Sequence, residues 1–118
     1  MTRDQERILA ELAERIGALA GDIVIARKRI QLHEQSAAEH RRAASEFRRR
    51  QGADAELPAA TRFGLDIAER AAIAARATLR GIEKSLSEAR DAYTNAHPLP
   101  FDAAALVDRE IRSALGPG

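Results

Sequence analysis

The sequence contains no cysteine and no tryptophan, and aromatic residues make up only 3% of its 118 residues. Disulfide bonds and cysteine-ligated zinc or iron–sulfur sites are therefore excluded. No apolar run approaches the roughly 20 residues that a membrane-spanning helix needs, and the charged N-terminus is unlike a secretory signal peptide. We therefore expect no membrane association and a cytoplasmic location.

Proline and glycine are also scarce, with 4 and 7 residues, whereas alanine, arginine, glutamate and leucine dominate. This composition is typical of long helices, and the length fits one domain. We therefore expect a single all-α domain spanning residues 1–118. The 19 basic and 18 acidic residues give a net charge of +1, which indicates no particular class of partner. Abundant alanine and arginine with few lysines also suggest a GC-rich bacterial source.

Apolar residues recur at alternating spacings of three and four along the first half of the chain. The positions are Leu9, Leu12, Ile16, Leu19, Ile23, Ala26, Ile30, His33, Ala37, His40, Ala44 and Phe47. This heptad pattern predicts a helix over about residues 3–50 with one face in a coiled-coil seam. Thr2 and Gln5 fit a capping box at its start.

A second series with the same spacing predicts a helix over about residues 58–96. Its positions are Leu65, Ala68, Ala72, Ala75, Leu79, Ile82, Leu86, Ala89, Tyr93 and Ala96. Gly52 and Pro58 mark the break between the helices, and so short a connection makes them antiparallel. Pairing the two seams about residue 56 places His40 opposite Ala72 and Ile16 opposite Ala96. We therefore predict a long antiparallel two-helix coiled-coil hairpin.

A short third helix is predicted over about residues 103–115. Asp102 is suited to its N-cap, Phe101 can contact Leu106 as a hydrophobic staple, and Gly116 ends the helix. We expect it to pack at the open end of the hairpin, on a surface of small residues on the first helix. That surface consists of Ala10, Ala13, Gly17, Ala20, Gly21 and Val24. The alternative is a frayed tail.

Two histidines, His33 and His40, occupy the predicted seam seven residues apart. Their separation on a helix is about 10 Å, too far for one metal ion to bridge. In the predicted register no cysteine, aspartate or other histidine lies opposite either of them. We interpret both as polar seam residues that fix the pairing, and we expect no metal or cofactor. In a dimer four histidines would meet, and a metal site or a pH-sensitive interface would then be the alternative.

A second apolar strip runs outside the seam on both long helices. It consists of Ile25, Leu32, Ile67, Ala71, Ala74, Thr78 and Gly81. The third helix reaches only about as far as residue 25, so we expect the upper part of the strip to be uncovered. Exposed apolar strips mark association sites, which favours a homodimer or a helical partner protein. The alternative is a mildly apolar, alanine-rich surface without a partner.

Positive charge is concentrated near the connection, where residues 27–50 hold eight basic and three acidic side chains. The arginines of this region are Arg41, Arg42, Arg48, Arg49, Arg50 and, on the second helix, Arg62. They could contact phosphates or an acidic protein surface. The alternative is a solvated helix end, where cations favour the helix dipole.

The sequence lacks the motifs of a phosphate-binding loop and of a nucleophile with its base, so we expect no enzymatic activity. We predict a protein–protein interaction module, which would be an adaptor, chaperone or assembly component that self-associates. The second hypothesis is a nucleic-acid-associated protein that uses its arginines.

Overall fold

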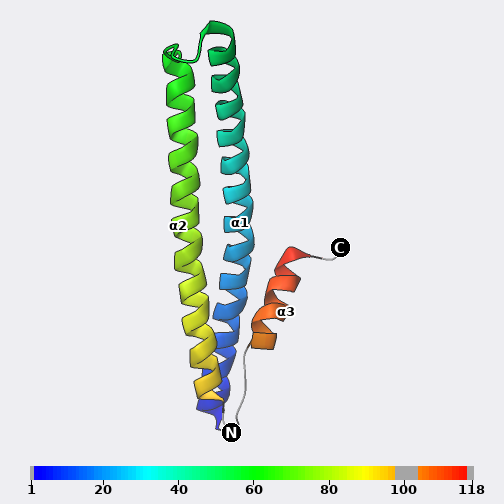
Figure 1. Ribbon diagram of the computed structural model, residues 1–118. Coiled ribbons are helices and arrows are strands. Elements are labelled where there is room, and N and C mark those ends of the chain that lie inside the picture. Colours follow the sequence, from blue (N-terminus) through cyan, green and yellow to red (C-terminus); the bar gives the residue numbers. More distant parts are fainter. Residues whose placement is uncertain (1, 98–103, 117–118) are drawn as a thin grey trace. The chain divides into compact units, whose positions relative to one another are not determined.

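The computed structural model describes residues 2–97 and 104–116, and within these ranges the protein has three α-helices and no strand (Figure 1). The helices are α1 (Arg3–Gln51), α2 (Ala59–Ala96) and α3 (Ala104–Leu115). The two long helices pack against each other, and α3 contacts α1. The predicted all-α fold is confirmed, with helix bounds within about one residue of the predicted ones. Phe101, Asp102 and residue 103 lie outside the described residues.

The ends of α1 follow local sequence signals. The backbone N–H of Thr2 donates to the side-chain oxygen of Gln5 at 2.8 Å, and the N–H of Gln5 donates to Thr2 Oγ1 at 3.2 Å. This is the predicted capping box. At the other end Gly52 has φ +115° and donates its N–H to the carbonyl of Arg48 at 2.8 Å. Glycine ends the helix here because it adopts positive φ without a Cβ clash.

The chain divides into two compact units. The terminal unit comprises residues 1–26 and 78–118, and the loop unit comprises residues 27–77. Each unit contains part of α1 and part of α2, and the terminal unit also contains α3. The expectation of a single domain over residues 1–118 stays a prediction.

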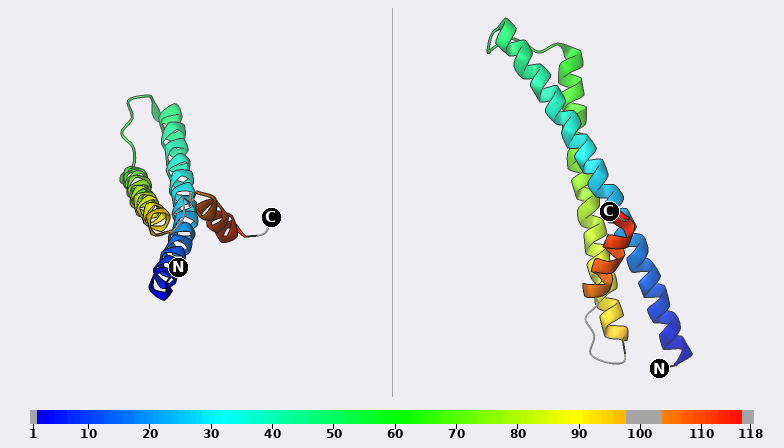
Figure 2. Two further views of the ribbon diagram at one scale, coloured as in Figure 1. Left: turned by 90° about the horizontal axis from the view of Figure 1, so that it is seen from below. Right: turned by 90° about the vertical axis from the view of Figure 1, so that its right-hand side faces the viewer.

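The core of the terminal unit consists of large aliphatic side chains. Ile16 is fully buried, and Ile23 is 2% exposed. Leu86 and Ala89 of α2 and Leu106 of α3 complete this cluster. All three helices therefore meet in one core, and α3 lies along α1 (Figure 2).

The predicted seat of α3 on α1 is confirmed in its central part. Ala20 and Val24, which lie outside the seam, are buried. A Cβ added at Gly17 would lie 3.3 Å from the carboxylate of Glu110, so α3 passes close to this glycine. Ala10, in contrast, is exposed and lies at the edge of the predicted seat.

The loop unit has a core of small residues. Its buried apolar residues are Ala37, Ala44, Leu57, Ala68 and Ala72. Seam residues of both helices in this unit are buried or half-buried, which confirms the predicted seam. Alanine removes little apolar area from water, so each contact contributes less here than in the terminal unit.

The register of the two helices in the loop unit differs from the predicted one. A Cβ added at Gly64 would lie 2.6 Å from two ring atoms of His40, so the imidazole lies directly against this glycine. Gly64 is eight residues from Ala72, or about 12 Å along a helix. The prediction that His40 lies opposite Ala72 is therefore wrong. His40 instead lies opposite a part of α2 that is about seven residues nearer the N-terminus of that helix.

The terminal unit is consistent with the same shift of one heptad. Leu12 lines a shallow hollow together with Ala92 and Ala96, whereas the predicted register places Ala96 opposite Ile16. Both seams repeat every seven residues, and we assign Leu9 and Leu65 to position a of the heptad and Leu12 and Ala68 to position d. A shift of seven residues therefore still places every residue at position a opposite one at position d. The heptad pattern specifies the seam and leaves this choice open.

The contact between His40 and Gly64 leads to a test with a matched control. Glycine inside a helix destabilises it by about 0.5–1 kcal/mol relative to alanine. At Gly81 nothing lies within 4 Å of an added Cβ, so Gly81→Ala should stabilise the protein by about that amount. Gly64→Ala should not, because the new methyl group displaces the His40 ring. Urea unfolding followed by circular dichroism measures the difference.

A double variant separates the clash from other effects at Gly64. In a His40→Ala background the ring is absent, so Gly64→Ala should recover the stabilisation seen at Gly81. Equal stabilisation by Gly64→Ala and Gly81→Ala in the otherwise unchanged protein would contradict the observed register.

Candidate functional site

The two seam histidines are half-buried on α1. His40 Nδ1 lies 2.7 Å from the carbonyl oxygen of Ser36. Because a carbonyl only accepts hydrogen bonds, Nδ1 carries the hydrogen and donates it. Within residues 2–97 and 104–116, no three His, Asp or Glu side chains are grouped to hold a metal ion. A histidine site shared between two copies stays a prediction.

The structure leaves most of the predicted apolar strip exposed, but the strip is divided between the two units. In the loop unit, Leu32 is 63% exposed, Ile67 is 65% exposed and Ala74 is also exposed, while Ala71 is half-buried. Ile25, Thr78 and Gly81 belong to the terminal unit and are exposed. We call the four residues of the loop unit the loop-unit strip.

Two further large apolar residues of the loop unit are exposed and were not predicted. Phe63 is 66% exposed and lies four residues before Ile67, so the two side chains are neighbours on the surface of α2. Ile73 is 63% exposed and lies outside the strip. The exposure of Phe63 and Ile73 could have been predicted from their positions outside the seam, because a large apolar residue there has no helix of the hairpin to pack against.

The other flank of the loop unit carries ion pairs between α1 and α2. Arg76 donates to Glu34 at 2.6 Å, and Arg41 donates to Glu69 at 3.3 Å. All four occupy heptad position e, whereas the loop-unit strip occupies positions c and g on the opposite side of the seam. The side chains of both pairs are about half exposed, so each pair contributes at most about 1 kcal/mol. The loop unit therefore carries the ion pairs between its two helices on one flank and the exposed apolar residues of the strip on the other.

The predicted arginines differ in their partners. Arg49 and Arg50 both pair with Glu46, at 2.7 and 3.6 Å, and Arg62 pairs with Glu56 at 3.2 Å. These ion pairs compensate part of the positive charge of the six arginines.

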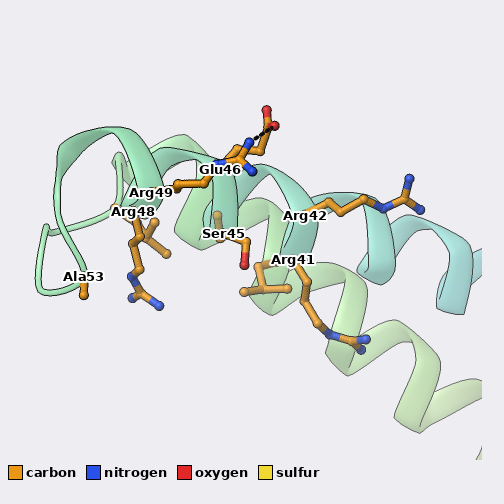
Figure 3. A pocket seen from close by; sticks show the side chains of 10 residues that line it. Arg41, Arg42, Ser45, Glu46, Arg48, Arg49 and Ala53 are labelled. Atoms are coloured by element: carbon orange, nitrogen blue, oxygen red, sulfur yellow. Dashed lines mark hydrogen bonds and ion pairs between the residues drawn. The ribbon is translucent and has the colours of Figure 1, made fainter.

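An open hollow of about 860 Å³ lies beside four of the predicted arginines (Figure 3). It is lined by Arg41, Arg42, Ala44, Ser45, Glu46, Arg48, Arg49, Ala53, Leu57 and Leu65. We call it the loop-end hollow. Arg50 and Arg62 are not among its lining residues. The sequence indicated the arginines, but it gave no sign of a hollow or of the leucines beside them.

None of the described helices combines the length and the apolar character that are needed to span a membrane. Comparisons with protein-family models, curated proteins and solved structures find no match to this chain.

Proposed function

We propose that the protein works by binding other proteins, without catalysis, as an adaptor, chaperone or assembly component that self-associates. The observation that carries this proposal is the exposure of Leu32 and Ile67 on one flank of the loop unit. Exposed apolar side chains that are contiguous on a surface mark association sites. Phe63 extends the apolar surface along α2 by one turn.

The two flanks of the loop unit are unequal as docking surfaces. Burial of the flank with the Arg41–Glu69 and Arg76–Glu34 pairs would desolvate four charged groups, which is costly. The loop-unit strip has no such charges, and its alanines let another helix approach closely. We therefore assign association to the strip.

A second copy of the chain is the partner that this surface suits. Two helices that expose an apolar strip can bury it against the same strip of another pair, which gives a four-helix bundle with two-fold symmetry. In such a dimer Leu32 and Ile67 would pack over Ala71 and Ala74 of the other copy. Large side chains would then meet small ones.

Light scattering of Ile67→Glu and Ile73→Glu tests the proposal. Both isoleucines lie on α2 and are about equally exposed, but only Ile67 belongs to the strip. The unmodified protein and Ile73→Glu should have the mass of a dimer, and Ile67→Glu the mass of a monomer. All three should keep the same helical circular dichroism. A monomeric unmodified protein, or equal dissociation by both substitutions, would overturn self-association through this strip.

A second candidate function is nucleic-acid binding through the arginines. It is favoured by Arg42 and Arg48, for which the described part of the chain provides no acidic partner. Binding of this kind releases counterions and weakens steeply with salt. A nucleic-acid complex should therefore dissociate as salt rises and be lost when Arg48, Arg49 and Arg50 are replaced by glutamate.

A further inference from the structure

The loop-end hollow has an apolar floor. Ala44 is 6% exposed and Leu57 is 8% exposed, and Leu65 beside them is half-buried. Leu57 comes from the connection between α1 and α2, and its side chain is buried although most residues of this segment are exposed. A floor of aliphatic side chains can accept an apolar side chain of a ligand.

The shift of the register explains why the hollow exists. In the shifted register the first residue of α2, Ala59, lies opposite about residue 46 of α1. The last turn of α1 therefore has no helix of this hairpin opposite it. The connecting residues Ala53 and Leu57 line the space but leave it open.

The rim of the hollow carries an excess of positive charge. Four arginines line it, and Glu46 is its one acidic lining residue among those that the structure describes. Glu46 already accepts from Arg49 at 2.7 Å. Arg42 and Arg48 have no acidic partner within the described part of the chain. In Figure 3, Arg41 and Arg48 extend to one side of α1 and Arg42 to the other.

We propose that the loop-end hollow binds an acidic peptide segment of a partner protein. An apolar side chain of the peptide packs on Ala44, Leu57 and Leu65, and a carboxylate of the peptide accepts hydrogen bonds from Arg48, which extends to the same side of α1 as Arg41 (Figure 3). The volume of about 860 Å³ is in the range of binding pockets for several side chains. None of the residues of the loop-unit strip lines the hollow, and binding there does not require self-association.

The composition of the hollow favours a peptide over a nucleic acid. Single-stranded nucleic acids bind by stacking their bases on aromatic side chains. No described lining residue of the hollow is aromatic. Phosphates would use the arginines alone and leave the aliphatic floor without a contact. Carboxylates on a segment with an apolar side chain would use both.

Fluorescence anisotropy with three labelled probes tests the proposal. The first probe is a short peptide of glutamate and leucine, the second has serine in place of each leucine, and the third is a single-stranded oligonucleotide of similar charge. At physiological salt the first probe should bind, and the second should bind about tenfold more weakly because it cannot use the floor. The oligonucleotide should bind more weakly than the first probe.

Arg48→Glu and the matched variant Arg27→Glu locate the site on the protein. Both arginines are exposed, occupy position e of α1 and undergo the same charge change, but Arg27 is 21 residues from Arg48 and 14 residues from Arg41, the nearest lining residue of the hollow. Arg48→Glu should weaken binding of the first peptide by about tenfold or more, because a charge-assisted hydrogen bond becomes a repulsion. Arg27→Glu should leave binding within about twofold, because salt screens a charge at that distance.

Three results would overturn the proposal. Equal loss of binding in Arg27→Glu and Arg48→Glu would mean general charge attraction without a site. Equal affinity for the leucine and serine peptides would remove the role of the floor. Tighter binding of the oligonucleotide, with a steep dependence on salt, would assign the arginines to nucleic acid.

Discussion

Ile16→Ala should lower the free energy of unfolding by about 2–5 kcal/mol, because it leaves a cavity in the core of the terminal unit. Ile16 is fully buried and belongs to the cluster in which all three helices meet. The neighbouring side chains are fixed by the helices that carry them, so the cavity cannot collapse completely. Urea unfolding followed by helical circular dichroism gives the change in free energy.

Ile73→Ala is the matched control for this substitution. It removes the same atoms from a side chain that is 63% exposed, so we expect a change within about 0.5 kcal/mol. A similar destabilisation by both variants would contradict the assignment of the core to Ile16.

Ala37→Glu should destabilise the protein by about 3 kcal/mol or more, because it places a charge where the two helices of the loop unit meet. Ala37 is fully buried in the seam of α1. A glutamate there must either stay in the seam without a partner or push the helices apart. The loss should appear as a lower midpoint of urea unfolding.

Ala77→Glu provides the comparison, since residue 77 is exposed on α2 in the same unit. There the carboxylate remains in water, and we expect a change of no more than about 0.5 kcal/mol. If Ala37→Glu were as mild as Ala77→Glu, the helices would not be in close contact at the level of Ala37.

The repeat of the apolar pattern every seven residues allowed the seam to be predicted from the sequence, and the same repeat prevented the register of the two helices from being predicted. A spacing of three and four identifies which side of each helix is apolar, and every predicted seam residue is buried or half-buried. Because the pattern repeats every seven residues, it does not distinguish two pairings of the helices that differ by a shift of seven residues. The contact of His40 with Gly64 indicates the observed choice, but a single glycine in a helix is too weak a signal to find it in advance.

The candidate sites were predictable to different extents. The exposure of Leu32 and Ile67 follows from their positions outside the seam, so the sequence was sufficient to predict that these side chains are exposed. The loop-end hollow depends on where α2 begins relative to α1 and on the burial of Leu57. Neither depends on a local pattern, because both are set by contacts between distant segments. The arginines could therefore be identified, but not the floor beneath them.

The difference between the two cores has a consequence for the speed of folding. Contacts in the loop unit join nearer parts of the chain, as in the Arg41–Glu69 pair across 28 residues and the Glu34–Arg76 pair across 42, and they close shorter loops at a somewhat smaller entropic cost. They bury mainly alanine and therefore stabilise little. The aliphatic cluster joins Ile23 to Leu86, 63 residues apart, so its larger stabilisation comes only after a long loop has closed. We expect the height of the folding barrier to be set by the formation of the aliphatic cluster in the terminal unit, and not by the closure of the loop between α1 and α2.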